Sequence, residues 1–446
     1  MDCSLFLILF ELLILFFAVM VLQCDILAPS VIVCFVFFIS TIILETNVYE
    51  WGINISPMTV FVVVTGLAVF VLIGCFLHQT KKGYRSRRAI EIPVFTISNY
   101  KLIISFVFEM CISFLYYKEV VRIASYVTQS WGMGLIWKYR QMAFYTDNLT
   151  ADQMMNPWVT QGYKMTMIIA YIMLFFFINN VVVNKQNISL NAKYLLLVPA
   201  YIFMLILAGN RLAIMNMVFF GITIWYILKN LKSGYTVKGS IKFVFRFLGV
   251  GILIIVAFWL MTSVVQRYTK LPFWTTISIY AGAPIQLLNE YLIEPIEHNV
   301  IWGQESLINI HNSLYKLGIS NYHSIINLEY RTYNGISLGN VYTTFRRYIQ
   351  DFGILGMLIA VGLESYFYNW IYYKKIRSIK KITYKTAMWI VLYSFMIYPV
   401  FLFSIEEYFT LMWSAGYLVT LILFLCMFFF YTKVSFSKLQ IRIQKW

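Results

Sequence analysis

The chain has 446 residues, of which 61% are hydrophobic and 12% are charged. A soluble domain is roughly half apolar and a quarter charged, so this composition excludes an ordinary soluble protein and indicates a polytopic membrane protein. The net charge of +16 does not indicate nucleic-acid binding, because the basic residues gather in short loops between apolar segments, where membrane topology explains them.

Apolar runs long enough to cross a bilayer recur along the whole chain. The predicted fold is therefore an all-α, polytopic integral membrane protein of one domain, 1–446. The number of predicted spans is about eleven, within a range of 10–12. The first run is read as a retained span, because it lacks a basic n-region and a small-residue cleavage site. The predicted spans are Ser4–Leu22, Ile26–Ile43, Met58–Leu77, Lys101–Tyr117, Met165–Val183, Lys193–Ala208, Leu212–Leu228, Phe243–Val264, Phe352–Tyr373, Thr386–Phe403 and Thr410–Tyr431.

The basic residues predict which loops face the cytoplasm. They are concentrated in the loop 81–88, around 185, in 229–238, in 374–385 and in the tail after 432. Placing these loops inside satisfies the positive-inside bias. The N-terminus and the two longest loops, 119–163 and 265–340, are then predicted to face outside.

The first outer loop, 119–163, interleaves aromatic and basic side chains. This pattern suits a segment that lies in the headgroup layer of a membrane. The residues that form the pattern are Trp131, Trp137, Trp158, Tyr126, Tyr139, Arg122, Lys138 and Arg140.

The second outer loop, 265–340, is the largest polar stretch of the chain and contains His298, His311 and His323. We predict helices over Phe273–Glu294 and Gln304–Leu317. Since the loop has no apolar core of its own, these helices are expected to pack on the ends of the spans.

Arg211 follows Gly209 and Asn210 in a turn between two predicted spans. A cation at membrane depth costs free energy, so its presence needs a reason. One interpretation is an arginine that extends to the outer headgroups. The other is a guanidinium that binds a phosphate with its fork of donors. We favour phosphate, because the positive-inside bias disfavours arginines on the outer side.

The ninth predicted span begins with a basic pair, Arg346 and Arg347. Arg347 and Asp351 are four residues apart and are predicted to form an ion pair on one helix face. Arg346 lies about 100° further round the helix and has no obvious partner in the nearby sequence. The positive end of a helix dipole also favours an anion here.

Candidate acid–base residues in the large loop are less well defined. His311 lies on an apolar stripe, which is equally typical of a hydrogen-bonded core histidine, and His323 lies in a polar loop. No sequence pattern for a metal site is present, so no metal or cofactor is predicted. The outer carboxylates form no recognisable catalytic pair by spacing: Glu290, Glu294, Glu297, Glu305 and Glu329.

Taken together, these features resemble the bacterial O-antigen polymerases, also called oligosaccharide repeat-unit polymerases. The resemblance covers the topology of the whole chain, but its motifs comprise about a dozen residues. These are the Gly-Asn-Arg turn and the two ends of the large loop, namely Tyr280-Ala281-Gly282-Ala283-Pro284 and Gly339-Asn340-Val341-Tyr342-Thr343, with Tyr348, Asp351, Phe352, Gly353 and Gly356.

The resemblance implies a metal-independent membrane glycosyltransferase, similar in architecture to the O-antigen ligases and GT-C enzymes. It implies transfer of a growing glycan from undecaprenyl diphosphate to the non-reducing end of a new lipid-linked repeat, on the periplasmic side of the bacterial inner membrane. The implied partners are this lipid-linked oligosaccharide, membrane lipid, a chain-length regulator and a flippase, with no nucleic acid. The implied site consists of Arg211, Arg346 and Arg347 for the diphosphate, Tyr280, Arg331 and Tyr342 for the glycan, and His311 and His323 for catalysis.

Two alternatives stay open on the sequence. An O-antigen ligase would use the same chemistry to transfer glycan to lipid A core, and the stretch after the large loop favours the polymerase. A lipid-linked oligosaccharide flippase or other transporter would more often place charges along its spans. Apart from the lysines that begin two of the predicted spans, few charges lie in them: Glu11, Glu109, Arg246 and Glu364.

Overall fold

The computed structural model describes residues 3–80, 89–127, 134–146, 149–235, 249, 272–295, 301–324, 328–437 and 440–443. Within these residues the chain is largely helical. The helices are α1 (Ser4–Val21), α2 (Pro29–Glu45), α3 (Val48–Trp51), α4 (Pro57–Gln79), α5 (Asn99–Ala124), α6 (Leu135–Tyr145), α7 (Pro157–Phe177), α8 (Ile188–Leu195), α9 (Pro199–Ala208), α10 (Arg211–Ser233), α12 (Phe273–Ala281), α13 (Ala283–Ile293), α14 (Ile308–Lys316), α15 (Thr344–Ile371), α16 (Tyr384–Met396), α17 (Tyr398–Phe401) and α18 (Ala415–Lys433).

Shorter elements complete the described fold. Two π-helical segments extend α7 and α15, and two small antiparallel hairpins lie at 331–339 and 434–443. Their bounds are η1 (Ile178–Val183), η2 (Tyr372–Ile376), the 3₁₀ turn η3 (Thr410–Met412), β1 (Arg331–Tyr333), β2 (Ile336–Gly339), β3 (Val434–Ser437) and β4 (Gln440–Ile443).

Eight of the described helices are long and apolar enough to cross a membrane, which makes this a membrane protein of largely helical structure. They run over Ser4–Val21, Pro57–Gln79, Asn99–Ala124, Pro157–Val183, Ile188–Ala208, Arg211–Ser233, Thr344–Ile376 and Ala415–Lys433. Each of the eight overlaps one of the predicted spans.

The other three predicted spans have different outcomes. Ile26–Ile43 corresponds to α2, an apolar helix of 17 residues. Thr386–Phe403 is divided between α16 and α17, and Pro399 lies at this break, where its missing N–H removes a helical hydrogen bond. Phe243–Val264 lies outside the described residues. A total of about eleven spans therefore stays a prediction.

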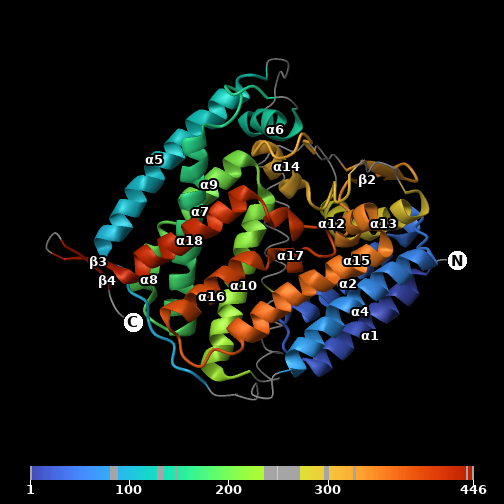
Figure 1. Ribbon diagram of the computed structural model, residues 1–446, viewed down its shortest axis with the longest axis horizontal. Coiled ribbons are helices and arrows are strands. Elements are labelled where there is room, and N and C mark those ends of the chain that lie inside the picture. Colours follow the sequence, from blue (N-terminus) through green and yellow to red (C-terminus); the bar gives the residue numbers. More distant parts are fainter. Residues whose placement is uncertain are drawn as a thin grey trace.

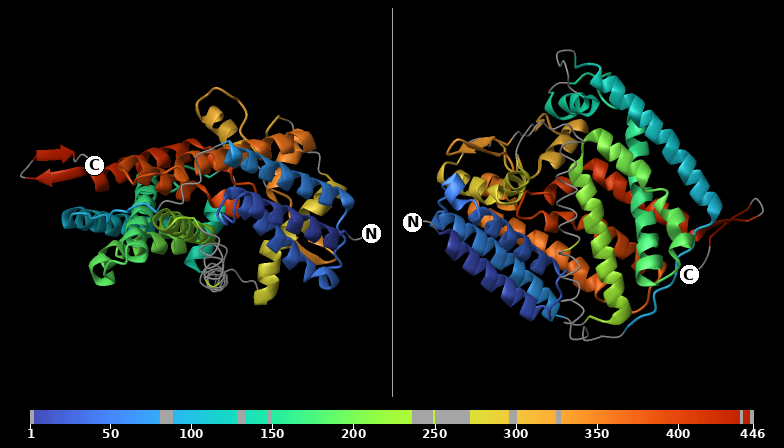
Figure 2. Two further views of the ribbon diagram at one scale, coloured as in Figure 1. Left: turned by 90° about the horizontal axis from the view of Figure 1, so that it is seen from below. Right: turned by 180° about the vertical axis from the view of Figure 1, so that it is seen from behind.

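The described helices form two groups (Figure 1). Helices α1, α2, α4 and α15 lie side by side in one group, whereas α5, α7, α9, α10, α16 and α18 form the other. The view from behind shows the same division (Figure 2). A site that draws residues from both groups must lie where the two meet.

Small and polar residues bring the helices of the first group together. Ser365 of α15 donates a hydrogen bond of 2.6 Å to the carbonyl of Phe70 in α4, and Ser30 of α2 donates to the same carbonyl. Asn369 donates to Ser365 and accepts from Ser30. Because hydrocarbon offers no competing water, such contacts and close backbone approach hold membrane helices together.

Asp25, in the turn between α1 and α2, connects the two groups at one end. Its carboxylate accepts hydrogen bonds from Tyr226 of α10 and Tyr372 of η2, at 2.8 and 2.9 Å, and pairs with Arg377 at 3.2 Å. The ring of Tyr235 lies 3.4 Å from the guanidinium carbon of Arg377. These partners satisfy a carboxylate that is 2% exposed.

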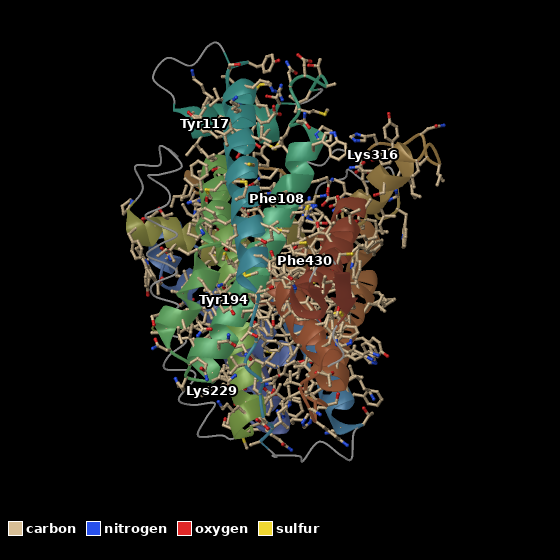
Figure 3. All side chains as sticks on the ribbon, turned by 90° about the vertical axis from the view of Figure 1, so that its left-hand side faces the viewer. Phe108, Tyr117, Tyr194, Lys229, Lys316 and Phe430 are labelled. Carbon is tan, nitrogen blue, oxygen red and sulfur yellow. The ribbon has the colours of Figure 1, made fainter. Side chains whose placement is uncertain are left out.

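The two ends of the bundle differ in what they carry. Figure 3 places Tyr117 of α5 and Lys316 of α14 near one end and Lys229 of α10 near the other. We call the first the loop end, because α6, α12 to α14 and the β1–β2 hairpin lie there (Figure 1). The second is the tail end, which holds the Asp25 cluster and the basic turn 374–381.

The large loop is partly helical, with a hairpin that the sequence analysis did not predict. The predicted helix Phe273–Glu294 is divided into α12 and α13 at Gly282, whose added Cβ would meet the backbone nitrogen of Leu44 at 2.9 Å. The predicted helix Gln304–Leu317 is shorter, as α14. Asn334 and Gly335 both have positive φ, 48° and 77°, which is the turn that joins two tightly paired strands.

Hydrogen bonds fix this loop to the first helix group. The buried Asn289 of α13 accepts from the N–H of Ser56 and the hydroxyl of Thr59, each at 2.8 Å, and donates to the carbonyl of Asn54. At the hairpin, Asn334 donates to the carbonyl of Trp51 at 2.8 Å. The described part of the loop is thus packed on the span ends, as predicted.

Helix α15 bends sharply where it leaves the loop end. Gly353 has φ 68° and ψ −178°, so it interrupts the helical dihedrals inside Thr344–Ile371. Only glycine adopts this region of backbone space readily. The bend separates a short first part, with Arg346 and Arg347, from the apolar part that follows.

Candidate functional site

The Gly-Asn-Arg turn has a specific local structure. Gly209 ends α9 in the left-handed region with φ 61°, and Asn210 caps α10 by accepting a hydrogen bond of 3.1 Å from the N–H of Ala213. Helix α10 then starts at Arg211. The N–H groups of the first turn give a helix N-terminus a partial positive charge, which favours an anion nearby.

The side chain of Arg211 lies against Tyr280, a residue predicted for the glycan. Arg211 is 7% exposed. Its Nη2 donates to the hydroxyl of Tyr280 at 3.1 Å, and its guanidinium carbon lies 5.4 Å from the centre of that ring. Tyr280 belongs to α12 in the large loop, so the fold brings together two predicted site residues that are distant in the sequence.

Arg140 of α6 is a second cation at this turn, and it is not one of the site residues predicted from the sequence. Its Nη1 donates to the carbonyl oxygen of Gly209 at 2.6 Å, and its Nη2 lies 3.4 Å from the hydroxyl of Tyr145. The ring of Phe144 lies 5.5 Å from the guanidinium carbon. The interleaved aromatic and basic residues of 119–163 are the sequence signal nearest to this site, but they predicted only a segment in the headgroup layer.

A pocket of about 470 Å³, which we call the cationic pocket, joins these residues at the loop end. Two arginines contribute to it, together with tyrosines and apolar side chains, and no Asp, Glu or His is among the described residues that line it. Its lining consists of Arg140, Phe144, Tyr145, Gly209, Asn210, Arg211, Leu212, Met215, Ile277, Tyr280, Ala281, Val341, Leu402, Ile405 and Tyr408.

The chemistry of the cationic pocket suits an anionic group with an apolar attachment. Two guanidinium groups and the N-terminus of α10 provide positive charge. Arginine binds phosphate through parallel N–H donors, and such bonds strengthen where water is partly excluded. Leu212, Met215 and Ile405 supply apolar surface beside the charges.

Arg346, predicted for the diphosphate, lies among acidic and aromatic side chains, most of them from the large loop. It is 1% exposed and forms ion pairs with Glu305 and, at 3.0 Å, with Glu329. The rings of Tyr291 and Tyr342 lie 4.9 and 5.3 Å from its guanidinium carbon. The sequence near Arg346 offers no obvious carboxylate partner, and the fold supplies two from the large loop.

The predicted ion pair between Arg347 and Asp351 is wrong. Arg347 pairs with Glu406, which precedes η3, at 2.6 Å. Asp351 instead accepts hydrogen bonds from the N–H groups of Glu305 and Ser306, at 3.1 and 2.6 Å. Both side chains thus attach other segments to α15, and a tertiary contact outweighs the i,i+4 contact, which contributes only about 0.2–0.5 kcal/mol.

Arg331 and Tyr342, predicted for the glycan, lie beside Arg346. Arg331 contacts Glu329 at 3.5 Å and donates to the carbonyl of Glu294 at 2.9 Å. Tyr342 donates to the carbonyl of Glu329 at 3.2 Å. Burial raises the pKa of Glu305, and the nearby Arg346 opposes this effect. Neither Arg331 nor Tyr342 is among the lining of the cationic pocket.

The two predicted catalytic histidines lie on or beside α14. The Nε2 of His311 is 3.2 Å from the carbonyl oxygen of Trp302, and its ring meets Tyr322 edge-on. His323 is exposed, with its ring 5.1 Å from that of Tyr315. Neither histidine is among the described lining of the cationic pocket.

A buried carboxylate pair near α15 was also missed. The hydroxyl of Tyr348 lies 3.2 Å from a carboxylate oxygen of Glu364 and 3.1 Å from one of Glu407. The single hydroxyl proton of Tyr348 can be donated fully to only one of the two carboxyl groups. If the other carboxyl group is protonated, it can donate a hydrogen bond to the Tyr348 oxygen. Glu407 further accepts from the N–H and the hydroxyl of Thr410, each at 2.6 Å.

Among the residues that the structure describes, no group of three or more His, Cys, Asp or Glu is placed to hold a metal ion. No family model, no curated protein and no solved structure matches the chain.

Proposed function

We propose that the chain is a membrane glycosyltransferase that polymerises lipid-linked oligosaccharide repeat units. In this reaction the bond between the first sugar of the growing glycan and its undecaprenyl diphosphate breaks. That sugar forms a new bond to a hydroxyl at the non-reducing end of a fresh undecaprenyl-diphosphate-linked repeat. The hydroxyl proton passes to a base, and undecaprenyl diphosphate leaves.

The cationic pocket is the observation that carries the proposal. Departure of the diphosphate develops negative charge on its oxygen, and preorganised donors that stabilise such charge are usually the largest contribution to catalysis. Arg140 and Arg211 face one pocket, and no carboxylate competes with a substrate anion among its described lining residues. One diphosphate, bound by both side chains, fits this arrangement.

The position of the pocket supports a lipid substrate. It lies where α9 ends and α10 begins, and both helices belong to candidate spans. A polyprenyl carrier keeps its chain in the bilayer and its diphosphate at the surface. A site beside the ends of spans meets this requirement, whereas a site in a detached domain would not.

The side of the membrane is inferred from charge. The basic turn 374–381 belongs to the tail end, and the positive-inside bias assigns that end to the cytoplasm. We therefore place the loop end and the cationic pocket in the periplasm of a bacterium, at its inner membrane. A chain-length regulator and the flippase that delivers the substrate are the proposed partners.

The proton acceptor stays a prediction. Glycosyl transfer needs a base for the acceptor hydroxyl, and His311 and His323 are the candidates that the sequence suggested. Replacing a general base lowers the rate by about 10²–10⁴-fold. Single-turnover rates of His311→Gln and His323→Gln therefore test each assignment, and rates equal to wild type would remove that histidine from the mechanism.

A lipopolysaccharide gel of a deletion strain tests the proposed function. A polymerase deletion leaves one repeat on each core, whereas deletion of a ligase leaves bare core. An unaltered ladder would reject both glycosyltransferases. A flippase deletion would instead leave lipid-linked repeats on the cytoplasmic side. In right-side-out spheroplasts these repeats would be protected from digestion by an added glycosidase.

A further inference from the structure

Helix α6 has two faces of opposite character. Tyr139 and Met142 are buried in the cluster that α6 forms with α5, α7 and α9. Trp137, Arg140 and Gln141 are spaced by three and four residues and therefore share the other face. Arg140 extends from this second face into the cationic pocket. Trp137 and Gln141, on the same face, are not among the described lining of that pocket.

A second hollow, of about 300 Å³, lies on this face and is lined by Trp137, Arg140, Gln141 and Tyr145. Arg140 and Tyr145 line both hollows, so the second adjoins the cationic pocket. Its volume is at the lower end of the roughly 300–1,000 Å³ typical of small-molecule sites. The proposed glycosyl transfer assigns no role to Trp137 or Gln141.

We propose that this second hollow is a glycan subsite, which holds a neutral sugar ring next to the anion bound in the cationic pocket. The indole of Trp137 offers a flat apolar surface for the C–H face of a pyranose. The amide of Gln141 and the hydroxyl of Tyr145 offer neutral donors and acceptors for sugar hydroxyls. A diphosphate and its first sugars are joined covalently, so adjoining subsites of these two characters match one ligand.

A lipid headgroup is the rival occupant, and the polar groups of the hollow disfavour it. Arg140 provides the single cation among the described lining residues, and it already donates to the carbonyl of Gly209 and lies near Tyr145. The remaining polar side chain, Gln141, is neutral. A site for an anionic phosphate would need more positive charge than this, whereas a neutral sugar would not.

The glycan-subsite proposal depends on the proposed function only for which glycan binds there. Its test uses two separate probes. The first probe is the lipid-free oligosaccharide released by mild acid from the surface polysaccharide of the source organism, measured by saturation-transfer NMR. The second is undecaprenyl diphosphate, measured by the shift in thermal unfolding. Both are applied to the purified full-length protein in nanodiscs of neutral lipid.

The variants are Trp137→Ala and Gln141→Ala, with Trp158→Ala as the matched control. Trp158 is an exposed tryptophan at the start of α7, in the same outer loop, and lines neither hollow. We expect Trp137→Ala to bind the oligosaccharide at least about tenfold more weakly, which corresponds to ~1.4 kcal/mol. It should keep the unfolding shift with undecaprenyl diphosphate, and Trp158→Ala should bind both probes as wild type does.

Several results would overturn the subsite. They are an absence of oligosaccharide binding to the wild type, equal binding by Trp137→Ala, or loss of both probes together in that variant. Trp137-dependent binding of soluble dihexanoyl phosphatidylglycerol in place of the oligosaccharide would assign the hollow to a lipid headgroup. By contrast, undecaprenyl diphosphate binding that survives Arg211→Ala would refute the proposed diphosphate site and leave a Trp137-dependent glycan site intact.

Discussion

Arg140 donates a hydrogen bond of 2.6 Å to the carbonyl oxygen of Gly209, the residue whose left-handed conformation ends α9. This bond attaches α6 to the turn from which Arg211 starts α10. Two arginines from separate segments are thereby held around one pocket. The rigid turn fixes both with respect to each other, as a bidentate anion site requires.

Replacing either arginine of the cationic pocket by lysine should impair polymerisation. Lysine keeps the charge but presents a single ammonium group instead of parallel donors. We expect Arg211→Lys to lower the polymerisation rate by about 10²–10³-fold, as loss of a transition-state donor does. Arg140→Lys should act in the same direction. The measurement is polymer formed from purified lipid-linked repeats.

Arg122→Lys is the matched control for these two variants. Arg122 lies in the same predicted loop as Arg140, 119–163, pairs with Glu119 at 2.7 Å and donates to the carbonyl of Met154. It is not among the pocket lining, so polymer formation should persist. Wild-type rates for both Arg211→Lys and Arg140→Lys would show that these side chains only anchor helix ends.

Local features of the fold were largely predictable from the sequence. Hydrophobic runs located the eight candidate spans, because only helices satisfy their own backbone groups in hydrocarbon. The Gly209-Asn210-Arg211 turn was predicted from residue types that end and cap helices. The neighbour of Arg211 in space, Tyr280, was predicted as a site residue, although their contact was not.

Contacts between distant segments were not predictable. Arg346 has no obvious carboxylate partner in the nearby sequence, and Glu305 and Glu329 reach it from the large loop. No periodic pattern encodes such a pairing, because it depends on how a loop folds back onto the spans. The β1–β2 hairpin did have a local signal, since Asn334-Gly335 favours a tight turn, but its strands contain only three and four residues.

Gly353→Ala should destabilise the protein through its backbone alone. Gly353 has φ 68° and ψ −178°, and nothing lies within 4 Å of an added Cβ. A non-glycine residue there costs on the order of 1–3 kcal/mol. The control is Gly221→Ala in α10, whose added Cβ would make an ordinary contact of 3.5 Å with Ile178. There alanine should stabilise the helix by up to about 1 kcal/mol. Thermal unfolding in nanodiscs compares the two, and equal midpoints would contradict the prediction.

Glu407 should make stability depend on pH. Burial raises the pKa of this carboxyl group above its ordinary value of 4.5, and its hydrogen bonds to Thr410 oppose the effect. The folded state therefore keeps a proton that the unfolded state has lost, so stability falls as pH rises from 4.5 through the raised pKa. Over that window one proton contributes up to about 1.4 kcal/mol per pH unit.

Glu407→Gln removes this titration while keeping an oxygen acceptor for Thr410. The difference between its unfolding midpoint and that of the wild type should grow as pH rises from 4.5 through the raised pKa, with the variant relatively more stable at high pH. Buried carboxyl groups that do not contact Glu407, such as Glu305, contribute equally to both proteins and cancel in the comparison. Glu364 shares the Tyr348 hydroxyl with Glu407, so the difference reports on this pair as a unit. The exposed Glu50→Gln is the control. A constant difference across the range would contradict the prediction.

The two ends of the bundle should face opposite sides of the membrane. Asn321 follows α14 at the loop end, and Lys380 lies in the basic turn before α16; both are exposed. In a background without the six native cysteines, Asn321→Cys should react with an impermeant maleimide in intact spheroplasts. Lys380→Cys should react only after the membrane is opened. The reverse pattern would refute the assigned orientation and place the cationic pocket in the cytoplasm.

Arg346 is predicted to hold the large loop on α15 through Glu305 and Glu329, and this role can be separated from diphosphate binding. Arg346→Met leaves Glu305 without a cation and leaves Glu329 with Arg331 alone. Breaking a buried pair from one side costs about 3–5 kcal/mol. The triple variant Arg346→Met, Glu305→Gln, Glu329→Gln removes the charges together and should recover much of that loss. Thermal unfolding of the purified variants measures both effects.

Undecaprenyl diphosphate distinguishes the two roles of Arg346. If Arg346 holds the loop, the triple variant should still gain thermal stability when the lipid diphosphate is added, because Arg140 and Arg211 remain in the cationic pocket. If Arg346 instead binds the diphosphate, as the sequence suggested, the triple variant should fold normally but lose most of the ligand-induced shift. Arg211→Ala provides the reference for lost binding. A ligand that binds only the folded state raises stability with the logarithm of one plus the ratio of free ligand to Kd, so a variant that no longer binds shows no shift. If the triple variant loses the ligand-induced unfolding shift to the same extent as Arg211→Ala, Arg346 belongs to the diphosphate site and its structural role is refuted.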